Sequence, residues 1–302
     1  MPGFSGDVNV LAQLSAALVA RAEEALASVV AIRDAHTSLS GILWANDVVV
    51  TSAQSLSRQD TYSLTDASGQ GREAKFAGAD TATNVAALKL STPLQSRPLA
   101  GRIPVAGELA LAFGAIDSGG LSTRLGIVNA VGDAWCSREG GQIDKRIGLD
   151  IRLDTSEEGG PVLDASGGFI GMSTFGPGRR VIAIPASTLE RVVPVLLKDG
   201  HVARGWLGLA LQPVAVPESF RGENSQCSAL MAMSVDSDGP AAKAGVLAGD
   251  ILLSVDGQST RKFRNITAKL GSGSVGRQIE LRLVRAGALQ SLALTVEARP
   301  SQ

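Results

Sequence analysis

The sequence predicts a mainly β protein with an N-terminal helix and two successive β-rich regions. Between Val29 and about Pro185, short apolar runs alternate with Gly, Asp and Ser clusters, a pattern typical of barrels and sandwiches. A helical segment then ends at Gly200, and a second β-rich pattern with two short helices follows it. Because 44% of the 302 residues are hydrophobic and 19% are charged, we expect a folded, globular chain.

Residues 7–27 predict the first element, an amphipathic helix. Its apolar residues recur at steps of three and four, at Val8, Leu11, Leu14, Leu18 and Ala22. We expect this face to dock on the chain's own β-rich core, since most amphipathic helices cover a core. A contact with another subunit is the alternative.

Five apolar runs predict strands in the first β-rich region: Val29–Ile32, Asp47–Thr51, Ala86–Leu90, Glu108–Phe113 and Phe169–Met172. The spacer at residues 96–104 divides these runs into two groups. Ser187 and Glu190 have capping-box spacing, which predicts a helix over residues 188–198.

The second β-rich region has its own order of elements. Its expected strands and helices are residues 206–211, a helix near 241–244, residues 249–255, a helix near 261–270, and residues 278–284 and 292–296. This order predicts a compact β-rich domain with two helices.

The net charge and the small number of Cys and His residues exclude several classes of partner. With a net charge of -1 and no basic stripe, the chain is a poor candidate for binding nucleic acid or anionic membranes. The Cys and His residues are too few and too scattered for a metal site, and we expect no cofactor. Cys136 and Cys227 lie in different predicted domains, so we expect free thiols.

The N-terminal residues lack the basic start of a secretory signal, and no apolar run approaches the length of a membrane-spanning helix. We therefore expect a cytoplasmic chain, or a periplasmic or membrane-anchored one if a leader has been trimmed.

Several stretches, in this order and spacing, resemble HtrA-type (DegP-like) serine proteases: residues 40–43, 49–54, 80–90, 107–114, 126–128, 150–162, 182–185 and 204–209. The resemblance implies a trypsin-like double six-stranded β-barrel followed by a PDZ domain. It implies three parts: an N-terminal helix at 1–28, the double barrel at 29–200 and the PDZ domain at 201–302.

The same resemblance assigns the catalytic positions. Gln54 stands where the family has its base, Asn84 where it has the orienting carboxylate, and Glu158 where it has the nucleophile. A glutamine amide cannot accept a proton near neutral pH, and a carboxylate is a weak nucleophile toward an amide. We therefore predict that the chain is not an enzyme but a pseudoprotease, which acts as a peptide-binding, scaffolding or regulatory protein through its PDZ domain. The alternative is a serine-type endopeptidase or chaperone that uses substitute residues.

The loop before the nucleophile position is also altered. Ser156 replaces a glycine that helps to form the oxyanion hole, whereas Gly159 keeps the path of the loop. We expect Glu158 either to point into solvent or to fold back onto the loop amides. Ser52 and Ser156 flank these positions, but the sequence suggests no base for either.

The PDZ resemblance implies a peptide-binding site. Trp206, Leu207, Gly208 and Leu209 match the carboxylate-binding loop, and the strand continues through Ala210. We expect Ile266 and Leu270 to complete an apolar pocket for the last side chain of a peptide. The expected partners are protein C-termini or extended peptides. The resemblance also implies a homo-oligomer, such as a trimer, or assembly with an active homologue.

Overall fold

The computed structural model describes residues 7–33, 38–221 and 226–299. It divides into two compact units, residues 1–135 with 143–201 and residues 202–302 with 136–142, and each is described here by itself. The boundaries at residues 28/29 and 200/201 stay predictions.

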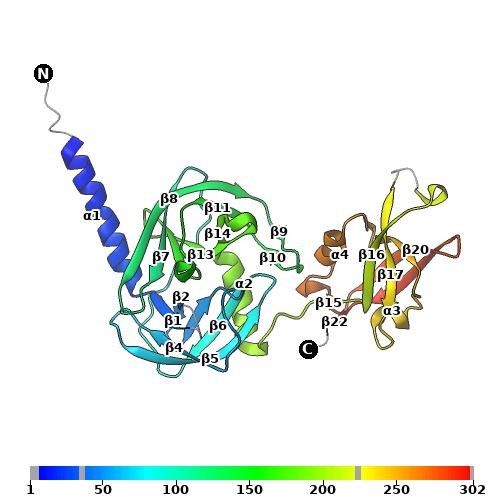
Figure 1. The fold of residues 1–302 in the computed structure, drawn as a ribbon, viewed down its shortest axis with the longest axis horizontal. Coiled ribbons are helices and arrows are strands. Elements are labelled where there is room, and N and C mark those ends of the chain that lie inside the picture. Colours follow the sequence, from blue (N-terminus) through cyan, green and yellow to red (C-terminus); the bar gives the residue numbers. More distant parts are fainter. Residues whose placement is uncertain (1–6, 34–37, 222–225, 300–302) are drawn as a thin grey trace, which may run out of the picture. The chain divides into compact units, whose positions relative to one another are not determined.

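The first barrel closes six antiparallel strands in the order β1-β2-β3-β6-β5-β4 (Figure 1). Its strands are β1 Val29–Arg33, β2 Ser38–Ala45, β3 Val48–Thr51, β4 Thr61–Thr65, β5 Gly71–Asp80 and β6 Val85–Leu90. Buried side chains such as Ile32, Val49 and Leu88 fill its interior. Closure leaves the barrel with no free sheet edge.

The second barrel closes in the order β11-β14-β13-β12-β7-β8. Its strands are β7 Leu109–Ala115, β8 Leu121–Gly132, β11 Arg146–Asp150, β12 Pro161–Asp164, β13 Phe169–Phe175 and β14 Val181–Pro185. Between β8 and β11 along the chain, β9 Trp135–Cys136 and β10 Gln142–Ile143 form a separate two-stranded sheet. The two six-stranded barrels confirm the predicted fold class.

Helix α2 (Ala186–Asp199) packs on β5 and β6 of the first barrel and on β13 and β14 of the second. Gly200 ends the helix, as predicted. Its φ is 74°, and its amide donates to Leu196 O. The predicted capping box is wrong: α2 begins at Ala186, so Ser187 lies inside the first turn and no side chain caps the helix.

Helix α1 (Asp7–Leu26) corrects a second expectation. Among its described apolar side chains, Val10, Leu11 and Leu14 are 62%, 68% and 43% exposed, and only Ala25, near its end, is buried. The described part of this helix therefore does not dock along the barrel, because just its last turns reach the core. None of the described helices is both long enough and apolar enough to cross a membrane.

The second unit contains a sheet in the order β16-β17-β18-β20-β21, which leaves β16 at one edge. Its elements are β15 Gly205–Trp206, β16 Leu209–Ala215, β17 Ser228–Val235, α3 Pro240–Lys243, β18 Ile251–Val255, β19 Gln258–Ser259, α4 Phe263–Lys269, β20 Gln278–Arg285, β21 Ala288–Thr295 and β22 Glu297–Ala298. Strand β17 was missed in the sequence. An apolar core that includes Leu230, Leu252 and Leu281 supports the sheet.

Candidate active site and peptide-binding edge

Glu158 lies at the centre of a buried polar cluster. It is 2% exposed and follows the short 3-10 turn η1 (Thr155–Glu157). Its carboxylate accepts hydrogen bonds from Ser52 Oγ at 3.0 Å, Gln54 Nε2 at 2.5 Å and the Ser55 hydroxyl. The loop after β3 supplies these three donors, so the cluster joins the first barrel to the second.

Two further donors come from the end of β13. The Thr174 hydroxyl donates to Glu158 Oε1, and the Phe175 amide lies 3.3 Å from the same oxygen. Asn84 links these groups, because its Nδ2 donates to Thr174 Oγ1 at 2.7 Å and its Oδ1 accepts from the backbone amide of Gln54 at 2.7 Å. We call Ser52, Gln54, Ser55, Asn84, Thr174 and Glu158 the Glu158 cluster.

The surroundings of Glu158 differ from both environments expected from the sequence. The side chain does not point into solvent, and its described partners are not the amides of its own loop. The amides of Glu157 and Glu158 donate instead to Asp154 O at 3.0 Å and Thr155 O at 3.3 Å. In this conformation, the turn itself uses the Glu158 amide, which an oxyanion hole at this position would need as a donor.

Gly159 fixes the path of the loop after Glu158. Its φ is 90°, and a Cβ there would overlap Ser40 O and Thr51 Oγ1. Strain and overlap together predict that Gly159→Ala lowers the free energy of unfolding by roughly 3 kcal/mol. Urea denaturation measures this change. The matched variant Gly71→Ala, where a Cβ meets no atom within 4 Å, is expected to change little; equal stability of both variants would contradict the account.

Glu157 is a second buried carboxylate, with partners that are separate from the Glu158 cluster. Burial alone would raise its pKa, but hydrogen bonds from the Asp154 amide, Ser122 and Arg124 outweigh burial and hold the pKa below its usual range. Arg124 Nε lies 2.8 Å from Glu157 Oε1, and Arg124 Nη2 lies 2.7 Å from Asp154 Oδ2. This pairing anchors η1 beside Glu158.

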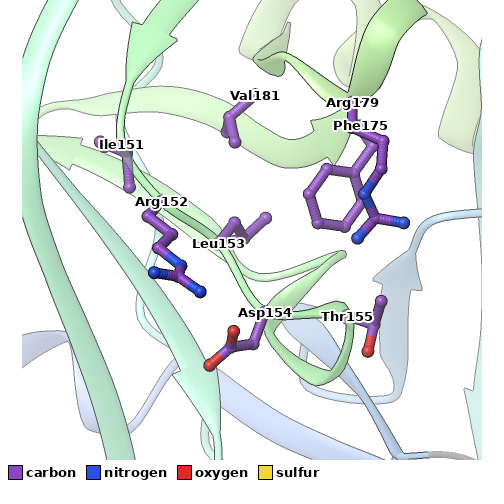
Figure 2. A pocket seen from close by; sticks show the side chains of 8 residues that line it. All are labelled: Ile151, Arg152, Leu153, Asp154, Thr155, Phe175, Arg179 and Val181. Carbon is purple, nitrogen blue, oxygen red and sulfur yellow. The ribbon is translucent and has the colours of Figure 1, made fainter.

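A pocket of about 500 Å³ lies beside the Glu158 cluster. Figure 2 shows the eight side chains that line it: Ile151, Arg152, Leu153, Asp154, Thr155, Phe175, Arg179 and Val181. Two of these residues also contact Glu158 through the backbone: Thr155 O accepts from its amide, and the Phe175 amide donates to its carboxylate. A polypeptide side chain in this pocket would therefore lie next to the cluster.

The predicted peptide-binding residues gather at the β16 edge of the second unit. Leu207 and Ile266 are buried in its core, and Leu209 and Leu270 pack against that core. Ala210 is exposed, whereas Trp206 is half-buried. Gly208 has a φ of 74°, and a Cβ there would lie 3.0 Å from Gly239 Cα. The turn thus requires glycine, but the peptide-binding roles stay predictions.

The histidines give no base in the described part of the site. His201 contacts Asp199 O, and His36 lies outside the described residues. The sequence suggested no base for Ser52, yet the structure places it against the Glu158 carboxylate. The roles of Ser55 and Thr174 were missed, because nothing in their local sequence indicates a contact with Glu158. Neither Cys136 nor Cys227 forms a disulfide within the described part of the chain.

Comparisons with known proteins identify a known domain in each unit. Residues 39–172 match the trypsin-like peptidase domain, and residues 231–285 match the PDZ domain. A probable periplasmic serine endoprotease, DegP-like, of Brucella suis is 32% identical over 275 residues, which are 87% of this chain and 53% of the relative. A Pseudomonas putida protein of the same name is 30% identical over 288 residues, 89% of this chain and 57% of the relative.

The chain therefore combines a trypsin-like peptidase domain with a PDZ domain, and its curated relatives are named DegP-like. Among solved structures, the HtrA-type protease AlgW with decapeptide has a TM-score of 0.72 at 20% identity, over 94% of this chain and 99% of that chain. The serine endoprotease of Yersinia pestis has a TM-score of 0.70 at 24% identity, over 93% and 97%. These likenesses confirm the fold. The chain spans about half the length of the curated relatives that it matches.

The prediction that this chain is not an enzyme is wrong. Both curated relatives are named serine endoproteases, which favours the alternative of an endopeptidase with substitute residues. The assignment of Gln54, Asn84 and Glu158 to the family's catalytic positions stays a prediction. The relatives are named periplasmic, so the expected cytoplasmic location has no support from them.

Proposed function

We propose that this HtrA-type chain is an endopeptidase that binds polypeptides at its PDZ edge and cleaves them at the Glu158 cluster. The observation that carries the proposal is the contact between the Ser55 hydroxyl and Glu158 Oε2. A hydroxyl held by a carboxylate has both parts that nucleophilic catalysis requires, a nucleophile and a proton acceptor. The names of the curated relatives support the reaction class.

Ser55 is the best placed of the three hydroxyls in the cluster. Ser52 and Thr174 are 0% and 1% exposed, so a substrate carbonyl cannot reach them. Ser55 is half-buried and lies on the loop after β3. Gln54, which is exposed and donates to the other carboxylate oxygen, is the donor that we assign to the developing oxyanion.

The proposed reaction has two balanced steps. Ser55 Oγ attacks the peptide carbonyl carbon while its proton passes to Glu158, which then protonates the leaving amine as the C–N bond breaks. Water then attacks the resulting ester and gives one proton to Glu158. That proton returns to Ser55 as the acid product leaves.

Casein cleavage by the full chain tests this function. We expect the wild-type protein to cut unfolded casein, and we expect Ser55→Ala to lower kcat/KM at least about a hundredfold, because it removes the nucleophile. The matched control is Ser91→Ala, which removes an exposed hydroxyl from the same barrel. Mass spectrometry of the fragments measures the rate. No cleavage by the wild-type chain, or equal cleavage by Ser55→Ala, would contradict the proposal.

The second part of the proposal concerns peptide capture. We infer that Trp206, Leu207, Gly208, Leu209 and Ala210 bind a peptide C-terminus as an added strand, with Ile266 and Leu270 in the apolar pocket. Two observations support this: β16 is an edge strand, and the amides of Leu207 and Gly208 have no acceptor among the residues that the structure describes. We also infer a periplasmic location. Homo-oligomerisation and assembly with an active homologue stay predictions.

A further inference from the structure

The pocket beside the Glu158 cluster combines an apolar floor with two guanidinium groups. In Figure 2, Leu153 and Val181 lie between Arg152 on one side and the Phe175–Arg179 pair on the other. Apolar walls with a few placed polar groups are typical of ligand pockets. The two arginines therefore decide which polar side chain the pocket accepts.

Neither arginine has an acidic partner among the described residues. The one acidic residue that lines the pocket is Asp154, and it pairs with Arg124 at 2.7 Å. The Arg179 guanidinium carbon lies 4.7 Å from the centre of the Phe175 ring. Stacking on the ring holds the guanidinium in place and leaves its N–H edge for a planar acceptor.

Glu157 and Glu158 follow the lining residues in the chain but do not line the pocket, and Glu157 pairs with Arg124. In the part of the chain that the structure describes, Glu158 has no such arginine partner. Its carboxylate is already held by Ser52, Gln54 and Ser55 from the first barrel and by Thr174. It therefore has no need of Arg152 or Arg179 as a counter-ion, and both remain available to a ligand. A guanidinium binds a carboxylate through two parallel N–H donors, which an uncharged amide cannot match.

We propose that this pocket binds the carboxylate side chain of an aspartate or glutamate in the polypeptide substrate, through Arg152 and Arg179. The inference rests on the proposed function, because it assumes that polypeptides reach the Glu158 cluster. It adds the chemical class of the residue beside the cleavage site. Arg180, the exposed neighbour of Arg179, does not line the pocket and supplies a matched control.

Binding of blocked peptides to the full chain tests the pocket apart from hydrolysis. The probes are fluorescein-labelled Ala-Ala-Asp-Ala-Ala-amide and its Asn counterpart, whose amidated ends exclude capture of a free C-terminus. We expect the Asp peptide to bind at least about tenfold more tightly, as fluorescence anisotropy measures. The double variant Arg152→Gln/Arg179→Gln is expected to abolish this preference, and Arg180→Gln to keep it.

Equal affinity for the two peptides, binding of neither, or a preference that survives in the double variant would overturn the inference. Casein cleavage separates this result from the proposed function. Cleavage without an Asp preference contradicts the pocket alone, whereas an Asp preference without cleavage contradicts the proposed reaction and supports the pocket. Circular dichroism of the double variant shows whether its fold is intact.

Discussion

Replacing Glu158 by glutamine is expected to lower kcat/KM for casein by about a hundredfold or more. The amide has nearly the same volume as the carboxylate, and one of its ends still accepts hydrogen bonds. It cannot take the Ser55 proton, so the attacking hydroxyl loses its base. Its NH₂ group also faces hydroxyls that now donate to Glu158, which moves Ser55 from its present position.

The matched variant for this change is Glu73→Gln, because Glu73 is exposed on β5. We expect it to keep the wild-type rate. Thermal melting of both variants separates loss of chemistry from loss of fold. A Glu158→Gln protein that is folded and as fast as the wild type would show that Glu158 is not the base.

Replacing Asp250 by alanine is expected to destabilise the PDZ domain by about 3 kcal/mol, the lower end of the range for breaking a buried pair. Asp250 is 1% exposed and takes two bonds from Arg285, Nε at 2.8 Å and Nη2 at 2.6 Å. It also accepts the Leu247 amide at 2.8 Å. Without the carboxylate, Arg285 on β20 loses its ion pair, and the Leu247 amide in the turn before β18 loses its acceptor.

Hydrogen exchange of residues 251–255 and 278–285 measures this loss locally, and binding of a peptide with a free C-terminus measures its effect on capture. Arg282→Ala, an exposed change on the same strand, is the control. An amidated peptide shows whether binding needs the carboxylate. Unchanged exchange in Asp250→Ala would contradict the prediction.

This pair also sets a pH dependence. Burial would raise the pKa of Asp250, but the hydrogen bonds from Arg285 and Leu247 outweigh burial and lower the pKa from its usual 3.8. A lowered folded-state pKa contributes stability above the unfolded pKa and loses it as the pH falls through the folded value. We therefore expect the PDZ domain to lose this contribution below about pH 4, and Asp250→Ala to lack that part of the acid transition.

The alternation of short apolar runs with turn residues predicted strands in a barrel or a sandwich, because strand patterning is local, and the family resemblance predicted the two six-stranded barrels. Gly200 likewise predicted the end of α2 correctly. The start of α2 was wrong by two residues, since the chain leaves β14 at Pro185 directly into the helix. The environment of α1 was also wrong, because an amphipathic pattern shows that a face is apolar but not what covers it.

The candidate site shows more clearly that local sequence does not predict contacts between distant residues. Family spacing identified Gln54, Asn84 and Glu158, and the structure brings them together. Ser55 and Glu158 are 103 positions apart, and their contact depends on how the two barrels pack. Local sequence holds no signal for such a contact. The sequence suggested no base for Ser52, and the structure places the Glu158 carboxylate against both Ser52 and Ser55.

Labelling of the full chain with a fluorophosphonate probe, followed by peptide mapping, tests most directly whether a hydroxyl of the Glu158 cluster is the nucleophile. The predicted result is one phosphonyl adduct on Ser55, strongly reduced in Glu158→Gln and retained in Ser91→Ala. An unlabelled Ser55 in a wild-type protein that cleaves casein would contradict this mechanism.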